Sequence, residues 1–107
     1  MSQVTDPVLQ SFLAGIAPLR GQIRDIYLFG SRARGDEKPD SDYDVLVVAK
    51  EKDYQLKDKI YDVVTDVCLK SSRDISLKFF SVEKFDRLKS IPSRFIRNVL
   101  TEGIKIG

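Results

Sequence analysis

Two aspartates separated by a single residue, Asp42 and Asp44, stand at the start of the apolar run 45–48. Side chains alternate between the two faces of a strand, so both carboxylates are expected to point to the same face. Neighbouring carboxylates repel each other, and Mg²⁺ relieves that repulsion while bridging the carboxylate oxygens to substrate phosphates. The pair therefore predicts a metal site.

A Gly-Ser pair, Gly30 and Ser31, ends the apolar stretch 26–29 and precedes Asp42 by a spacer of ten residues. Glycine has no side chain, so backbone amides at such a turn can approach a phosphate closely, and Ser31 adds a hydroxyl donor. Three basic residues follow the pair: Arg32, Arg34 and Lys38. We expect Arg34 to contact phosphate and Arg32 to be solvated, because a lone surface arginine usually is.

The Gly-Ser pair, the spacer of ten, Asp42-x-Asp44 and the valine-rich run together resemble the nucleotidyltransferase superfamily related to DNA polymerase beta. More narrowly, the turn resembles the Gly-Ser-x-Ala-Arg-Gly motif of the minimal nucleotidyltransferases, matched by Gly30, Ser31, Ala33, Arg34 and Gly35. The resemblance implies a polymerase-beta-like α/β (α+β) fold with a small mixed sheet backed by helices. It also implies that the Gly-Ser turn holds the triphosphate of ATP, the nucleotide donor, and that the aspartates hold Mg²⁺, with room for two ions.

The family also takes a third carboxylate from the following strand, here the segment 73–80. Depending on how that strand is aligned, the position falls on Asp74 or on Ser76. Both share one face of the strand, so alternation does not decide between them. We take Asp74 as the candidate, which in a chain without histidine would also accept the proton of the acceptor hydroxyl. Ser76 in that position would leave the metal site incomplete.

The resemblance also bears on the acceptor. Many minimal nucleotidyltransferases are antitoxins paired with a helical HEPN ribonuclease toxin, and some transfer AMP from ATP to a tyrosine of that toxin. A HEPN-like protein partner is therefore expected. A second interpretation is a non-catalytic antitoxin or adaptor that keeps the fold and acts by binding its partner. Transfer to a small molecule such as an aminoglycoside, or to RNA, is weakened because 107 residues leave no room for a substrate domain.

Composition sets further limits. The length predicts one domain over residues 1–107, and the formal charge of +2 argues against nucleic acid as the main ligand. Cys68 is the only cysteine, which excludes an internal disulfide, and no apolar run is long enough to cross a bilayer. We therefore expect a cytoplasmic protein, with its oligomeric state open. The absence of histidine removes imidazole bases and Ser-His triads, and the four tyrosines are expected to be packing groups.

Apolar periodicity predicts the elements that position these residues. They are a helix from Pro7, capped by Thr5 or Asp6 and ended by Pro18 and Gly21; strands at 26–29, 43–49 and 74–81; a helix with an apolar stripe over 56–67; a tail helix over 85–100 interrupted at Pro92; and a last short strand at Ile104 and Ile106. The strand at 74–81 alternates apolar and polar residues. The sheet is thus expected to be half covered, with the aspartates on its open side.

The aspartates also fit two simpler roles. Asp40, Asp42, Asp44 and Glu51 imitate a calcium EF-hand loop, but Val45 stands where that loop needs glycine. The segment 40–42 could also be a polar turn with Asx hydrogen bonds. The Gly-Ser pair at the family spacing favours the nucleotidyltransferase interpretation over both.

Overall fold

The structure, a computed structural model, describes residues 6–35, 38 and 41–107. Its elements are α1 (Pro7–Ile16), the 3₁₀ helix η1 (Ala17–Gln22), β1 (Ile23–Phe29), α2 (Ser31–Arg34), β2 (Tyr43–Ala49), α3 (Tyr54–Ser71), β3 (Ile75–Ser81), α4 (Val82–Lys89), α5 (Arg94–Glu102) and β4 (Ile104–Lys105). Thr5, one of the two predicted caps of the first helix, and Asp40 lie outside the described residues.

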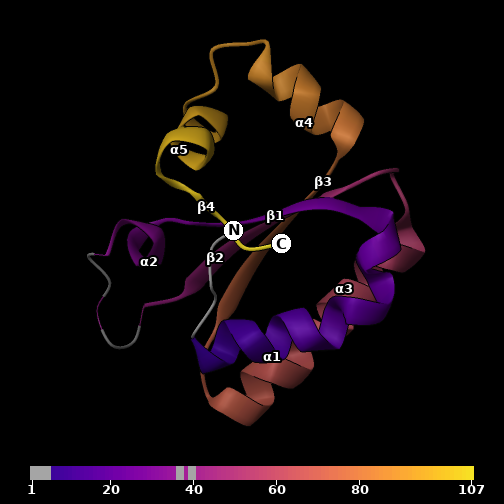
Figure 1. The fold of residues 1–107 in the computed structure, drawn as a ribbon, viewed down its shortest axis with the longest axis vertical. Coiled ribbons are helices and arrows are strands. Elements are labelled where there is room, and N and C mark those ends of the chain that lie inside the picture. The colour runs from indigo at the N-terminus through magenta and orange to yellow at the C-terminus, as the bar shows by residue number, and fades with distance from the viewer. Residues whose placement is uncertain (1–5, 36–37, 39–40) are drawn as a thin grey trace.

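The four strands form one mixed sheet in the order β3-β2-β1-β4. β2 pairs antiparallel with β1 and parallel with β3, and β4 pairs antiparallel with the outer side of β1. The parallel pair has the long helix α3 as its crossover, as parallel strands require. β2 is the second strand from the β3 edge of the sheet (Figure 1). Asp42 immediately precedes β2, and Asp44 is its second residue.

Helices cover both faces of this sheet (Figure 1). α1 and α3 pack on one face, where Phe12, Ile16 and Ile60 join the buried side chains of β1 and β2. α4 and α5 pack on the other face, where Phe85, Ile96 and Val99 meet buried residues of β2. The expectation of an open second face was wrong in this respect, because the tail splits at Pro92 into two helices that bury their own apolar sides.

The longer helices are capped at their N-termini by side-chain oxygens. Asp6 accepts hydrogen bonds from the amides of Val8 (2.8 Å) and Leu9 (3.3 Å), which confirms it as a cap of α1. Asp53 caps α3 in the same way, and Ser81 and Ser93 cap α4 and α5. Each cap satisfies amides that have no partner within the helix. Among the described residues, no helix is long and apolar enough to cross a membrane.

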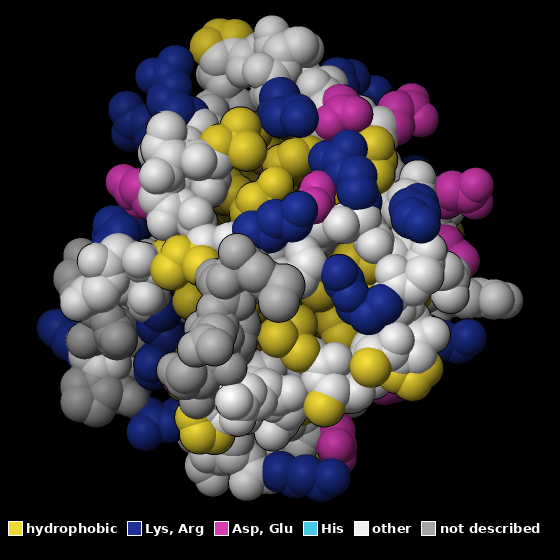
Figure 2. All heavy atoms as spheres, in the orientation of Figure 1, with side chains coloured by type: hydrophobic (Ala, Val, Ile, Leu, Met, Phe, Trp, Pro, Cys, Tyr) yellow, Lys and Arg dark blue, Asp and Glu magenta, His cyan; other side chains and the backbone are white. Residues whose placement is uncertain are grey.

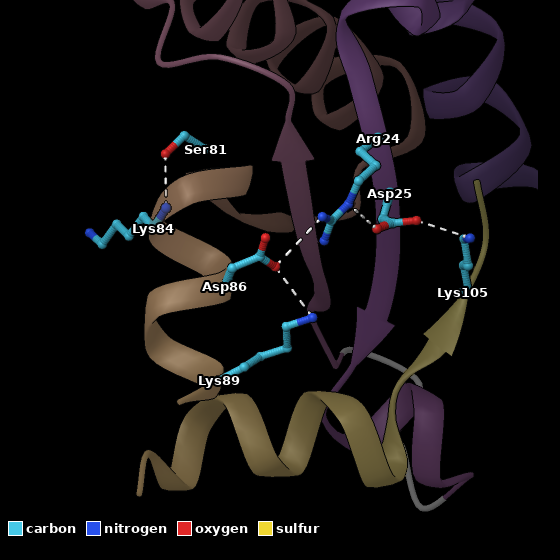
Figure 3. Close-up of polar contacts among 7 residues, drawn as sticks. All are labelled: Arg24, Asp25, Ser81, Lys84, Asp86, Lys89 and Lys105. Carbon is cyan, nitrogen blue, oxygen red and sulfur yellow. Dashed lines mark hydrogen bonds and ion pairs between the residues drawn. The ribbon is translucent and has the colours of Figure 1, made fainter. Parts of the chain in front are cut away.

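A charged network ties the C-terminal elements to β1 (Figure 3). Asp25, which is 8% exposed, accepts from Arg24 Nε at 2.8 Å and from Lys105 Nζ of β4 at 2.9 Å. Arg24 also reaches Asp86 of α4 at 3.6 Å, and Asp86 pairs with Lys89. Burial alone raises the pKa of Asp25, but hydrogen bonds from Lys105 and Arg24 outweigh it and hold the pKa below its usual value. The ionised Asp25 carboxylate therefore stabilises the attachment of β4 to β1.

Candidate nucleotide and metal site

The Gly30 turn brings β1 against the beginning of β2. Gly30 has φ 76° and ψ −156°, a region that essentially only glycine occupies. A Cβ atom added at this position would collide with Oδ2 of Asp44 and lie 3.1 Å from Cγ of Asp44. Glycine is thus required both by the backbone conformation and by the carboxylate that lies against it.

The short helix α2 follows directly from this turn. The carbonyl of Gly30 accepts hydrogen bonds from the amides of Ala33 and Arg34, both at 3.1 Å. No side chain caps α2, and among the described residues the Ser31 hydroxyl makes no side-chain hydrogen bond. Gly30 lies against the Asp44 carboxylate, and the uncapped first turn of α2 follows it directly in the chain. Arg34 Nη1 lies 3.4 Å from Glu102 of α5, an exposed ion pair that costs little to break.

Arg32 anchors the chain that returns to β2. Its Nε and Nη2 atoms donate to the carbonyl of Ser41 at 3.0 and 2.8 Å. Its guanidinium carbon lies 3.9 Å from the centroid of the Tyr43 ring, and Tyr43 donates through its hydroxyl to Asp6. The expectation that Arg32 is solvated was therefore wrong. The sequence shows that Arg32 is near a turn, but it does not show which group the side chain contacts. The carbonyl that Arg32 binds is nine residues away in the chain.

Asp42 and Asp44 lie together at the beginning of β2, as their alternation predicts. Asp42 is exposed and Asp44 is half-buried, with the ring of Tyr43 buried on the opposite face. Burial raises the pKa of the Asp44 carboxyl, and the charge of Asp42 raises it further, while Lys78 and Arg34 act in the opposite direction. An unfavourable pair of carboxylates whose repulsion is only partly offset is a donor set that fits a hard divalent cation.

The parallel register decides which residue of β3 is level with Asp44. Asp44 pairs with Ser76, and Tyr43 pairs with Ile75. Asp74 immediately precedes β3, is exposed, and accepts a hydrogen bond through its carbonyl from the Tyr43 amide at 2.9 Å. The described residues contain no group of three acidic, cysteine or histidine side chains placed to hold a metal ion. The structure thus brings Asp42 and Asp44 together but does not gather Asp74 into a three-carboxylate cluster with them.

Lys78 is a charged neighbour of the site that the sequence motifs did not indicate. It is exposed on β3, two residues beyond Ser76, and its charge lowers the pKa of Asp44. The signal that could have found it is the same period-two alternation, because 76 and 78 share the face of the strand on which Asp44 lies. Lys78 and Arg34 thus place positive charge beside the half-buried carboxylate.

Comparison with known proteins supplies the family. Residues 13–107 match the family model described as polymerase beta, nucleotidyltransferase. Over 86 residues, 78% of each chain, the sequence is 43% identical to the Methanocaldococcus jannaschii protein named "Putative protein adenylyltransferase". The family match covers both the Gly-Ser turn and the sheet that carries the aspartates.

Three solved structures have a similar fold. A crystal structure of a toxin-antitoxin with AMP-PNP aligns with a TM-score of 0.59 and 20% identity, over 97% of this chain and 73% of that chain. A structure of the tri-AMPylated Shewanella oneidensis HEPN toxin in complex with an MNT antitoxin aligns with a TM-score of 0.50 and 18% identity, over 94% and 71% of the two chains. A third solved structure, described as a minimal nucleotidyltransferase, aligns with a TM-score of 0.58 and 23% identity over 89% of this chain and 85% of that chain. Together with the family match, they confirm the expected fold. The chain belongs to the polymerase beta nucleotidyltransferase family.

Proposed function

We propose that this nucleotidyltransferase moves AMP from ATP onto a hydroxyl of a partner protein, a HEPN-like toxin, with Asp42 and Asp44 as its metal-binding carboxylates. The observation that carries the proposal is the contact between the Gly30 turn and Asp44. The Gly-Ser turn lies directly beside the Asp44 carboxylate, whose neighbour is Asp42. A metal-bridged triphosphate needs both features within a few ångströms of each other.

The triphosphate would lie along the turn. The amides that follow Gly30 and the hydroxyl of Ser31 would donate to its oxygens, and Arg34 would exchange its exposed contact with Glu102 for phosphate. Lys78 of β3, whose charge lowers the pKa of Asp44, would contact the same triphosphate. Mg²⁺, when bound by Asp42 and Asp44, would neutralise charge on the phosphates and lower the pKa of the acceptor hydroxyl.

In the transfer step, the acceptor oxygen forms a bond to the α-phosphorus of ATP. The bond between that phosphorus and the bridging oxygen to the β-phosphate breaks, and pyrophosphate leaves. The hydroxyl proton needs a base, and Asp74 is our candidate because its backbone lies beside the segment that carries Asp42. Ser76, the residue of β3 that pairs with Asp44, has no carboxylate. Asp74 is therefore the only acidic residue that β3 and the residue before it offer to this end of the sheet.

The acceptor is proposed from the relatives. A protein 43% identical to this chain is named for protein adenylylation, and a structural neighbour carries an AMPylated HEPN toxin beside its MNT antitoxin. The site itself is consistent with a large acceptor, because Asp42 is exposed and no further domain within the described residues covers it. A protein hydroxyl can therefore reach the carboxylates from solvent.

Transfer of label from [α-³²P]ATP to the co-purified partner tests this function. Wild type with Mg²⁺ should label the partner at one or more hydroxyl side chains, and Asp42→Asn with Asp44→Asn should reduce labelling at least about a hundredfold. Asp62→Asn on the exposed face of α3 is the matched control and should label normally. A wild type that labels no partner but still suppresses its toxicity would favour the non-catalytic antitoxin.

A further inference from the structure

A second cleft lies at the opposite end of the sheet from the aspartates. It opens where the parallel strands β2 and β3 end, has a volume of about 540 Å³, and is bounded by the segment 50–54 and the beginning of α4. β2 has seven residues, so this end lies about 20 Å from Asp44. In Figure 1 it is the side of the sheet away from α2. Its volume is in the range of ordinary ligand pockets.

Five basic side chains line this cleft: Lys50, Lys52, Lys57, Lys84 and Arg87. Within the part of the chain that the structure describes, none of the five forms an ion pair, whereas Lys70, Lys89 and Lys105 elsewhere do. Figure 3 shows the Lys84 side chain pointing away from the charged network of Arg24 and Asp86. Cations that form no ion pair and gather around one hollow raise its positive potential.

Three acidic residues, Glu51, Asp53 and Glu83, also line the cleft. Asp53 uses Oδ1 to accept from the amides of Gln55 and Leu56, at 2.9 and 3.1 Å, as the cap of α3. Glu83 stands in the first turn of α4, where a carboxylate offsets the positive end of the helix. Five basic and three acidic residues leave the lining of the cleft with a formal charge of +2, equal to that of the whole chain.

Aromatic rings stand beside the same cations. Tyr54, which lines the cleft, is 64% exposed, the least buried of the four tyrosines, which were expected to be packing groups. Lys52 lies 5.5 Å from the centroid of the Tyr54 ring, and Lys84 lies 4.7 Å from that of Phe80. Phe80 is partly buried and packs edge-to-face on Phe95, so Tyr54 is the exposed ring of the pair. An exposed ring next to lysines that form no ion pair is a combination with which proteins bind unpaired bases and their phosphates.

We propose that this cleft binds a short segment of single-stranded nucleic acid, with Lys52 and Lys84 contacting phosphates and Tyr54 stacking on a base. Other lysines lie on separate elements, such as Lys70 on α3, Lys78 on β3 and Lys105 on β4. Figure 2 shows basic side chains distributed over one face of the molecule. The cleft differs because five basic side chains line one hollow together with the exposed ring of Tyr54. Binding here is independent of the transfer reaction, because it uses none of the residues at the aspartate end.

The test is fluorescence anisotropy of the full chain with fluorescein-labelled ten-nucleotide RNA and DNA strands, measured over a range of salt. Lys52→Ala with Lys84→Ala should reduce the slope of log Kd against log salt by about 1.4, because each phosphate contact on a single strand accounts for about 0.7. Lys59→Ala with Lys70→Ala removes the same charge outside the cleft and should leave the slope unchanged. Binding of either strand with this difference supports the proposal.

A stacking variant separates a base site from a merely basic surface. Tyr54→Ala should weaken binding about fivefold or more, and Tyr54→Phe should restore it. Saturating MgATP should not displace the strand, which keeps this result distinct from the nucleotide site. Equal slopes for the cleft and control variants, an unchanged affinity in Tyr54→Ala, competition by MgATP, or no binding of either strand at 100 µM protein (about 10⁻⁴ M, the weak end of non-specific binding) would each overturn the proposal.

Discussion

Gly30 and Asp44 touch across the join between β1 and β2, so that no side chain at residue 30 can coexist with the present position of the Asp44 carboxylate. Both residues are needed at the site for different reasons. Gly30 gives the turn its shape, and Asp44 gives the site its charge. Any substitution of one residue is therefore expected to affect the other.

Gly30→Ala tests this contact. The variant should lose about 1–3 kcal/mol of stability through backbone strain, with a further loss from the collision with Asp44. Gly35→Ala is the matched control, because Gly35 also has a positive φ of 81° but nothing lies within 4 Å of an added Cβ. Urea denaturation should show that Gly30→Ala combined with Asp44→Ala is more stable than the sum of the two single changes. If the stability changes of the two single variants are additive, the contact between residue 30 and Asp44 contributes nothing to stability.

The raised pKa of Asp44 predicts a dependence of stability on pH. Because burial and Asp42 raise the folded-state pKa above the ordinary 3.8, ionisation of Asp44 opposes folding. The resulting penalty is absent below pH 3.8 and complete once the pH exceeds the raised pKa. In metal-free buffer, Asp44→Asn should therefore have a higher Tm than wild type at pH 7, by a few degrees, and the difference should vanish near pH 3. Equal Tm values at pH 7 would contradict this.

The Asp25 network predicts the opposite pH behaviour. Its pKa is lowered by Lys105 and Arg24, so the carboxylate stabilises the fold above pH 3.8, and this contribution is lost as the pH falls through the lowered folded-state pKa. Asp25→Asn should be about 1–2 kcal/mol less stable than wild type at pH 7 in urea denaturation. The gap should close in acid. Asp86→Asn, at the more exposed end of the network, should cost less at every pH.

The third carboxylate can be resolved by a set of three variants. Asp74→Ala should still bind MgATP but transfer AMP about 10²–10⁴-fold more slowly, because it loses the proposed base. Ser76→Ala should transfer normally. Ser76→Asp would place a third carboxylate level with Asp44 and should bind Mn²⁺ more tightly than wild type in calorimetry. Full activity of Asp74→Ala would remove Asp74 from the site.

Much of the fold could be predicted because its signals are local. The run from Tyr43 to Ala49 is a strand with the predicted bounds, and Asp6 caps the first helix as its position before Pro7 indicates. Contacts between residues that are distant in the sequence were harder to predict. β1 begins at Ile23, three residues before the predicted start, because its pairing with β2 extends through the bulge near Asp25. Tyr54 was expected to pack and is exposed, since its place before the apolar stripe gives no sign of its neighbours.

The site shows the same difference between local signals, which could be predicted, and contacts between distant segments, which could not. Alternation correctly placed Asp42 and Asp44 together and Tyr43 on the opposite face. It could not choose between Asp74 and Ser76, which share a face of the strand, because the choice depends on the register between β2 and β3. The clamp of Arg32 on Ser41 and the approach of Lys78 to Asp44 likewise depend on how separate segments pack.

Titration calorimetry of ATP into the metal-free chain, with and without Mg²⁺, tests the central claim most directly. We expect binding of one ATP that requires Mg²⁺, is abolished by Asp42→Asn with Asp44→Asn, and is weakened in a folded Gly30→Ala variant but not in Gly35→Ala. Asp62→Asn should bind as wild type does. Binding that is independent of Mg²⁺, or that survives in the double aspartate variant, would contradict the assignment of Asp42 and Asp44 to the metal-bound nucleotide.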